Sequence, residues 1–141
     1  MAESNRRKVE LAIVVVIIAA LASFLLPALE RSRMQIEEAM VQTEAAAIRV
    51  ELLDRLAHRE AFGGDLPQSA NPLRWIGRVP EAYLGELDAA PAARNVWYFD
   101  TRTEVLVYRF RSSGEARFRL TRGITGANTA GVLAGVGLIR E

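Results

Sequence analysis

The sequence predicts an α+β protein in which a long N-terminal helix, half in a membrane and half amphipathic, packs on a small antiparallel β-sheet head. Three observations support this fold class. Residues 11–29 form an apolar run, residues 30–60 contain neither glycine nor proline, and residues 96–120 contain two runs rich in β-branched and aromatic residues followed by a polar–apolar alternation at 115–120. The first two patterns are typical of helices, and the third is typical of strands.

Four segments follow from these patterns. We expect a cytoplasmic basic leader at residues 1–8 and a transmembrane helix at 9–29. An amphipathic helix continuing from the membrane is expected at 30–62, and a periplasmic α+β head at 63–141. The length of the chain suits one small domain joined to an anchor.

The apolar run has the length and composition of a membrane span. Its only polar side chain is Ser23, and a helix of this length would extend about 28 Å, close to the hydrocarbon thickness of a bilayer. The basic residues Arg6, Arg7 and Lys8 precede the run, which favours a cytoplasmic N-terminus. A cleavable signal peptide is the alternative, because residues 20–22 match the small-residue pattern of a cleavage site.

Two residues at the ends of this run are candidate functional residues. Glu10 places a carboxylate at the edge of the apolar segment, where a charge is costly and needs a partner. We expect that partner to lie on another helix of the same kind. Pro27 lacks a backbone N–H, but neighbouring groups make a proline tolerable in a membrane helix. It predicts either a kink or the end of the membrane segment.

The segment after the membrane carries one apolar helical face. Its members are spaced three or four residues apart, and charged residues occupy the other faces. The face consists of Val41, Ala45, Ile48, Leu52 and Leu56. It is too short for a coiled coil, so we expect it to pack against the head. Gly63 and Gly64 predict the end of the helix.

The head combines a loop-rich part with a three-stranded meander. Residues 65–94 are rich in proline, glycine and asparagine, which predicts a structured loop with one short helical turn near residues 81–87. Strands are expected at residues 96–100, 105–111 and 115–120. The glycine-containing tail, residues 123–141, is expected either to add an edge strand or to lie as a loop.

Composition argues against several classes of function. A net charge of +1 provides no strong field for nucleic acid, and the absence of cysteine removes thiolate chemistry. His58 is the only histidine, and the chain has no phosphate loop, serine-hydrolase motif or metal-ligand spacing. We therefore expect no enzyme, no catalytic residue, no cofactor, no metal site and no small-molecule substrate.

Arginines gather on the predicted strands. They are Arg109, Arg111, Arg117, Arg119 and Arg122. Alternation places the first two on one face of their strand, and likewise the next two. Two interpretations remain open, a solvated face of the sheet and a docking surface for an acidic partner.

The glutamate, the aliphatic run and the proline together resemble a type IV pilin-like protein, either a minor pilin or a pseudopilin of a type II secretion system. Such proteins have a glutamate that opens the apolar helix, a proline at this same distance, and a long amphipathic helix. Residues 97–100 and 106–109 are similar to the first hairpin of many pilin-like heads. The cleavage site differs from the family pattern, because Asn5 replaces the usual glycine and Arg6 the usual phenylalanine.

The resemblance implies a single-pass inner-membrane protein with a periplasmic head, serving as a subunit or assembly factor of a pilus or secretion pseudopilus. Its partners would be other pilin-like subunits, contacted through the N-terminal helix. Glu10 and Pro27 would be the assembly residues, and Arg6, Arg7 and Lys8 would set the membrane orientation. The alternative is a membrane-anchored periplasmic binding or adaptor domain that is not incorporated in a filament.

The altered cleavage site implies that the leader is retained. In the family, the glutamate is thought to pair with the freed N-terminal amine of a neighbouring subunit. In an uncleaved chain, Glu10 would instead pair with a preceding arginine or lysine, or with the amine of a processed neighbour.

Overall fold

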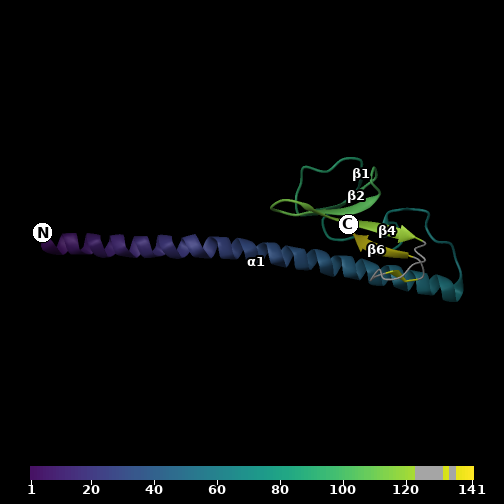
Figure 1. Ribbon diagram of the computed structural model, residues 1–141, viewed down its shortest axis with the longest axis horizontal. Helices are drawn as coiled ribbons and strands as arrows, with labels where there is room; N and C mark the ends of the chain where they lie inside the picture. The colour runs from purple at the N-terminus through teal and green to yellow at the C-terminus, as the bar shows by residue number, and fades with distance from the viewer. Residues whose placement is uncertain (123–131, 134–135) are drawn as a thin grey trace. The chain divides into compact units, whose positions relative to one another are not determined.

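A long helix precedes a small β-sheet in the computed structural model, which describes residues 1–122, 132–133 and 136–141 (Figure 1). The elements are the helix α1 (Ala2–Phe62), the 3-10 helix η1 (Pro72–Arg74) and the strands β1 (Tyr83–Leu87), β2 (Val96–Asp100), β3 (Val105–Arg109), β4 (Glu115–Arg122), β5 (Val132–Leu133) and β6 (Val136–Arg140). The chain divides into two compact units, Met1–Glu38 and Ala39–Glu141.

The N-terminal unit is helical from Ala2 onwards. Its apolar stretch is long and apolar enough to cross a membrane, and the side chains of that stretch are not buried in the protein. The stretch therefore fits a single membrane span by length and composition, although an N-terminal signal sequence has the same two properties.

Pro27 lies inside α1 and does not end it. Because proline has no N–H, the carbonyl of Ser23 loses its helical donor. The Ser23 hydroxyl donates to the Ala19 carbonyl, at 2.8 Å. The helix nevertheless continues beyond Pro27 to Phe62.

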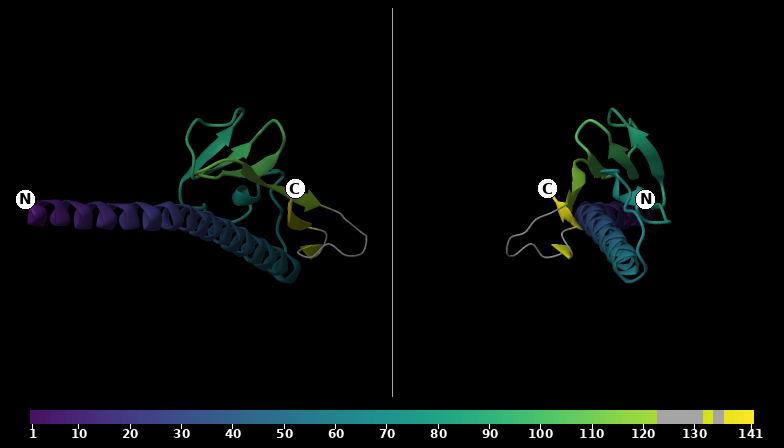
Figure 2. Two further views of the ribbon diagram at one scale, coloured as in Figure 1. Left: turned by 60° about the vertical axis from the view of Figure 1, so that its left-hand side comes forward. Right: turned by 90° about the vertical axis from the view of Figure 1, so that its right-hand side faces the viewer.

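The C-terminal unit contains a sheet with the strand order β1-β2-β3-β4-β6-β5. Strands β2, β3 and β4 form the predicted antiparallel meander, with Tyr98 opposite Val107 and Val107 opposite Arg117. Figure 2 shows this sheet along one side of the second half of α1. The α+β class and the packing of a long helix on a small sheet are as predicted, and this is a pilin-like architecture.

Strand β1 corrects the expectation of a helical turn near residues 81–87. It pairs parallel to β2, with Tyr83 opposite Trp97 and a register shift before Glu86, so the sheet is mixed. The Trp97 amide donates to the Ala82 carbonyl at 3.1 Å. The local helical signal was weak, and the unpaired edge of β2 supplied hydrogen-bond partners that a short helix would not have. The short helix of this region is instead η1, which begins after Asn71.

The predicted apolar face of α1 is buried, as expected. Val41, Ala45, Ile48, Leu52 and Leu56 are all at most 5% exposed. They share a core with residues from η1, from its C-cap and from the sheet, among them Leu73, Trp75, Leu106, Phe118 and Leu138. The other face of the sheet carries a second, smaller cluster made of Tyr98, Val105 and Val107.

Three polar features complete the attachment of α1 in this unit. Arg78, from the loop, contacts Glu44 at 2.9 Å and Glu51 at 2.7 Å. Arg49 donates to the Leu138 carbonyl at 2.9 Å. The helix ends as predicted at Gly63, whose positive φ of 77° is easy for glycine and whose amide caps a carbonyl of the last turn.

The tail supplies a strand, one of the two expected outcomes. β6 pairs antiparallel with β4, and β5 pairs with β6. The remaining part of that expectation, at residues 123–131 and 134–135, lies outside the described residues.

Candidate functional site

Glu10 contacts a basic residue of its own helix. The Arg6 Nε atom donates to Glu10 Oε1 at 3.2 Å, one helical turn away. Side chains on a helix tilt toward its N-terminus, so Glu10 extends toward the leader and away from the apolar run. Both side chains are mostly exposed, Arg6 at 80% and Glu10 at 62%. Two partners were expected for Glu10 in an uncleaved chain, a preceding basic residue or the amine of a processed neighbour. The structure places the first kind, Arg6, beside the carboxylate.

The other candidate residues lie apart from this ion pair. Pro27 is about 26 Å further along the helix axis, because each residue adds 1.5 Å. Lys8, two residues before Glu10, points to another side of the helix. Arg7 is three residues before Glu10 and lies on a neighbouring part of the helix surface, but among the described residues the ion pair of Glu10 is with Arg6. The structure does not bring the predicted assembly residues into one site within a single chain.

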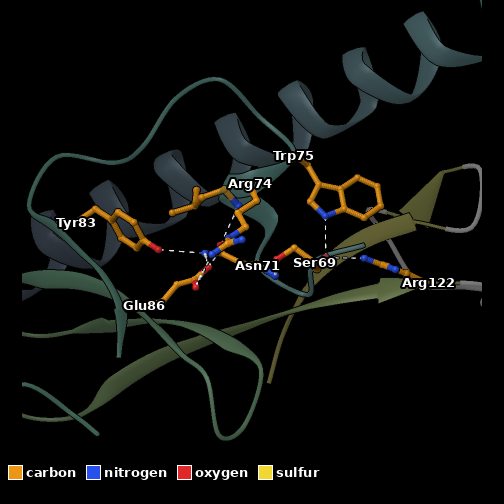
Figure 3. Close-up of polar contacts among 8 residues, drawn as sticks. Ser69, Asn71, Arg74, Trp75, Tyr83, Glu86 and Arg122 are labelled. Atoms are coloured by element: carbon orange, nitrogen blue, oxygen red, sulfur yellow. Dashed lines mark hydrogen bonds and ion pairs between the residues drawn. The ribbon is translucent and has the colours of Figure 1, made fainter. Parts of the chain in front are cut away.

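A polar network around a buried asparagine organises the loop between α1 and β1 (Figure 3). Its centre is Asn71, which is 2% exposed. Asn71 Oδ1 accepts from the Leu73 amide at 3.0 Å, which caps η1. Its Nδ2 group donates to the Tyr83 hydroxyl at 3.1 Å and to Glu86 Oε1 at 2.9 Å. One buried amide therefore ties η1 to β1, and its hydrogen-bonding groups are used.

Arg74 and Glu86 form a two-pronged ion pair in the same network. Arg74 donates through Nε at 2.7 Å and through Nη2 at 2.8 Å to the two carboxylate oxygens. Hydrogen bonds from Arg74 and from Asn71 hold the pKa of Glu86 below its ordinary value. Burial raises the pKa of Tyr83. The hydrogen bonds of the network thus favour the ionised form of Glu86, whereas burial favours the neutral form of Tyr83.

A second set of contacts ties the loop to β4. Trp75 Nε1 and Arg122 Nη2 both donate to the Ser69 carbonyl, at 2.8 and 2.5 Å (Figure 3). The Arg122 guanidinium also lies 4.8 Å from the centre of the Trp75 ring, a cation–π distance. Arg122 is therefore bound to the loop of its own domain.

An open groove of about 830 Å³ lies beside the network. Its walls include the loop around Ser69, the Arg74–Glu86 pair, Phe99 and Thr101. The groove offers hydroxyl and amide groups together with an ion pair whose charges are already matched. Among the described residues that line it, no hydrogen bond joins the hydroxyl of Ser69 or Thr101 to a carboxylate.

The arginines of the sheet divide between its two faces. The pairing register places Arg117 opposite Val107 and Arg119 opposite Val105, over the small apolar cluster. Arg122 is on the other face, with Trp75.

On the face over that cluster, acidic side chains of the same chain accompany the arginines. Arg109 lies 3.3 Å from Glu115, and Arg119 lies 2.5 Å from Glu141. Arg117 contacts the same two glutamates at 3.7 and 3.9 Å. These pairs favour a charge-matched sheet face over a docking surface for an acidic partner.

No family model, curated protein or solved structure matches this chain at a significant level. The resemblance to pilin-like proteins therefore rests on the placement of Glu10 and Pro27 and on the fold. That fold places the two residues in the segment that fits a membrane span, and it places the polar network and groove in the head.

The polar network was missed by reasoning from the sequence. One local signal was present, because Asn71 directly precedes Pro72, and asparagine before proline is typical of a helix start. The partners Tyr83 and Glu86 carried no such signal. They meet Asn71 only because β1 pairs with β2.

Proposed function

We propose that this chain is a membrane-anchored, pilin-like subunit or assembly factor of a type IV pilus or a type II secretion pseudopilus. One observation carries the proposal. A carboxylate, Glu10, opens a helix of membrane length, and Pro27 follows seventeen positions later (27 − 10) on the same helix. The second half of that helix packs on a small sheet, which is the arrangement the pilin resemblance implies.

The proposed mechanism is assembly through α1. The basic leader would stay in the cytoplasm, the apolar stretch would cross the inner membrane, and the head would fold in the periplasm. Glu10 would sit at the cytoplasmic border of the bilayer, where a cation on a neighbouring helix stabilises its charge. The core of the head, within the described residues, is built from Val41 onwards, so we expect insertion and folding to be separate from assembly.

The rival function is a periplasmic adaptor domain that never enters a filament. The groove beside Ser69 and Phe99 is the observation that favours it, because an open groove with polar walls suits a bound peptide or loop. In an adaptor, the helix would serve only as an anchor, and Glu10 would be dispensable.

Substitution of Glu10 by glutamine tests the proposal, because glutamine keeps the shape and removes the charge. We expect Glu10→Gln to insert and fold normally. It should lose co-purification with pilin-like partners and lose filament-dependent secretion or motility. Glu10→Asp should be intermediate, since its carboxylate is one methylene shorter.

Glu3→Gln is the matched control, because it removes the same charge from the first turn of the same helix. It should behave as wild type. Normal partner binding and a normal filament phenotype in Glu10→Gln would favour the adaptor instead.

A further inference from the structure

We propose that Arg6 is a positioning residue for Glu10, one that holds one carboxylate oxygen and leaves the other for a cation on a neighbouring helix. This inference rests on the proposed function. Arg6 Nε contacts Oε1 at 3.2 Å. Within residues 1–122, 132–133 and 136–141, no hydrogen bond to Oε2 is present. The carboxylate is thus oriented by its own chain and still open to a partner.

The order of Arg6 and Glu10 along the helix suits a position at the membrane border. Arg6 lies one turn before Glu10, and both side chains lean toward the N-terminus. The carboxylate is therefore drawn to the aqueous side of the apolar run, where long charged side chains reach the interface. A glutamate without this contact has more rotamers available, and some of them point along the apolar helix.

The ion pair of Arg6 with Glu10 contributes little to the stability of the helix. Exposed ion pairs contribute little in water, and an arginine before a glutamate is the less favourable order along a helix. Beside hydrocarbon the effective dielectric constant falls, so the same contact holds the side chains more firmly. Its effect is then on where Glu10 points rather than on whether the helix forms.

Arg6 differs from Lys8 in its position relative to Glu10. Lys8 carries the same charge, but residues two apart on a helix do not face each other. Lys8→Gln is therefore matched to Arg6→Gln in charge and in membrane-orientation effect, and it differs in its relation to Glu10. The role of Arg6 also survives a cleavage after Asn5, because Arg6 would then be the first residue.

The contact itself can be measured without any partner. The full chain, labelled with ¹⁵N-arginine and ¹³C-glutamate, is placed in vesicles of phosphatidylethanolamine and phosphatidylglycerol. Solid-state NMR should show several short-range arginine Nε to glutamate Cδ signals, because the head also holds such pairs, for example Arg74 with Glu86. One of these signals should disappear in Arg6→Gln while the others persist, and all should persist in Lys8→Gln. A spectrum that Arg6→Gln leaves unchanged would overturn the positioning role.

Association of two differently tagged full-length copies in the membrane gives the second readout. We expect Arg6→Gln to lower recovery of the second copy about threefold, with Lys8→Gln near wild type and Arg6→Lys partly restored. Arg6→Gln combined with Glu10→Gln should be no weaker than Glu10→Gln alone, because Arg6 acts only through Glu10.

Equal losses in Arg6→Gln and Lys8→Gln would mean that only total charge matters and would overturn the inference. Additive losses in the double variant would overturn it as well. Wild-type copies that fail to associate while the NMR contact is present would contradict the proposed function, and the hold of Arg6 on Glu10 would stand.

Discussion

Asn71 shows how one side chain can organise a loop. Tyrosine and tryptophan aside, it is the one buried polar residue among those the structure describes, and it joins η1 to two residues of β1. A buried amide is costly to leave unpaired, so the loop can close only with Tyr83 and Glu86 in place. The conformation of the loop and the pairing of β1 therefore depend on each other.

Replacement of this amide should destabilise the head. We expect Asn71→Ala to lower the free energy of unfolding by about 2–3 kcal/mol, because it removes three hydrogen bonds and uncaps η1. Urea titration of the full chain in detergent measures this, with fluorescence from the buried Trp75 and Trp97 as the signal. Gln68→Ala, at an exposed position of the same loop, should change the value by less than about 0.5 kcal/mol. Equal effects of the two substitutions would contradict the role of the network.

Glu86 should make the stability of the head depend on pH. Its pKa in the folded protein lies below the ordinary value of 4.5, first because Arg74 and then because Asn71 donate to the carboxylate. The unfolded chain therefore takes up this proton more readily. The stabilisation is fully present above about pH 4.5 and is lost as the pH falls through the folded pKa.

The test compares urea titrations of wild type and Glu86→Gln across that acidic range. Glu86→Gln should be less stable than wild type at neutral pH, and the difference should shrink on acidification. Asp88→Asn, at an exposed carboxylate outside the network, is the control and should leave the pH profile of wild type intact. A difference between Glu86→Gln and wild type that stays constant with pH would show that the ion pair is not the cause.

At the level of elements, the second half of α1 is held by a narrow buried face. Ile48 is 0% exposed, whereas Val50, two residues along, is 65% exposed. A half-turn of helix thus separates a core position from a solvent position. The packing of the sheet on α1 depends on buried residues such as Ile48, since burial of apolar surface is the main favourable term in packing.

This difference predicts opposite outcomes for two similar substitutions. Ile48→Ala should lower the free energy of unfolding by about 2–5 kcal/mol, because it deletes buried methyl groups and leaves a cavity. Val50→Ala should change it by less than about 0.5 kcal/mol. Both are measured by urea titration with the tryptophan signal. Comparable losses at the two positions would mean that the exposed side of α1 is also packed in solution.

For the whole molecule, the basic leader and the apolar stretch predict the orientation of the head. Arg6, Arg7 and Lys8 favour a cytoplasmic N-terminus, so a reporter fused after Glu141 should be active only if it works in the periplasm. Alkaline phosphatase is the reporter for a periplasmic C-terminus, and a cytoplasmic fluorescent protein is the reporter for a cytoplasmic one. Activity of the cytoplasmic reporter with a silent phosphatase would reject this orientation.

The state of the N-terminus is a separate prediction. Because Asn5 occupies the place of the expected glycine, the mature chain should begin at Met1 or Ala2. Intact-mass measurement on membrane-extracted protein shows which residue is first. A terminus at Arg6 would show that a prepilin peptidase accepts asparagine, and a terminus at Ser23 would favour cleavage as a signal peptide.

Local patterns in the sequence were sufficient to predict the long helix, its buried face and the strands of the meander. The face from Val41 to Leu56 has helical spacing, and the meander strands are rich in β-branched and aromatic residues, so each element follows from contacts between near neighbours in the chain. The helix stop at Gly63 is equally local. The spacing of Glu10 and Pro27 also belongs to the sequence, and its role in assembly stays a prediction.

Only the tertiary structure decided the features that join distant segments. β1 forms because the edge of β2 was open to it, the Asn71 network forms because β1 is there, and the arginines divide because the register places Arg122 beside Trp75. The separate strengths of these contacts are small, and each depends on the others being formed. Such mutual dependence leaves no periodic signal along the chain, which is why the loop and its network could not be predicted from the residues in order.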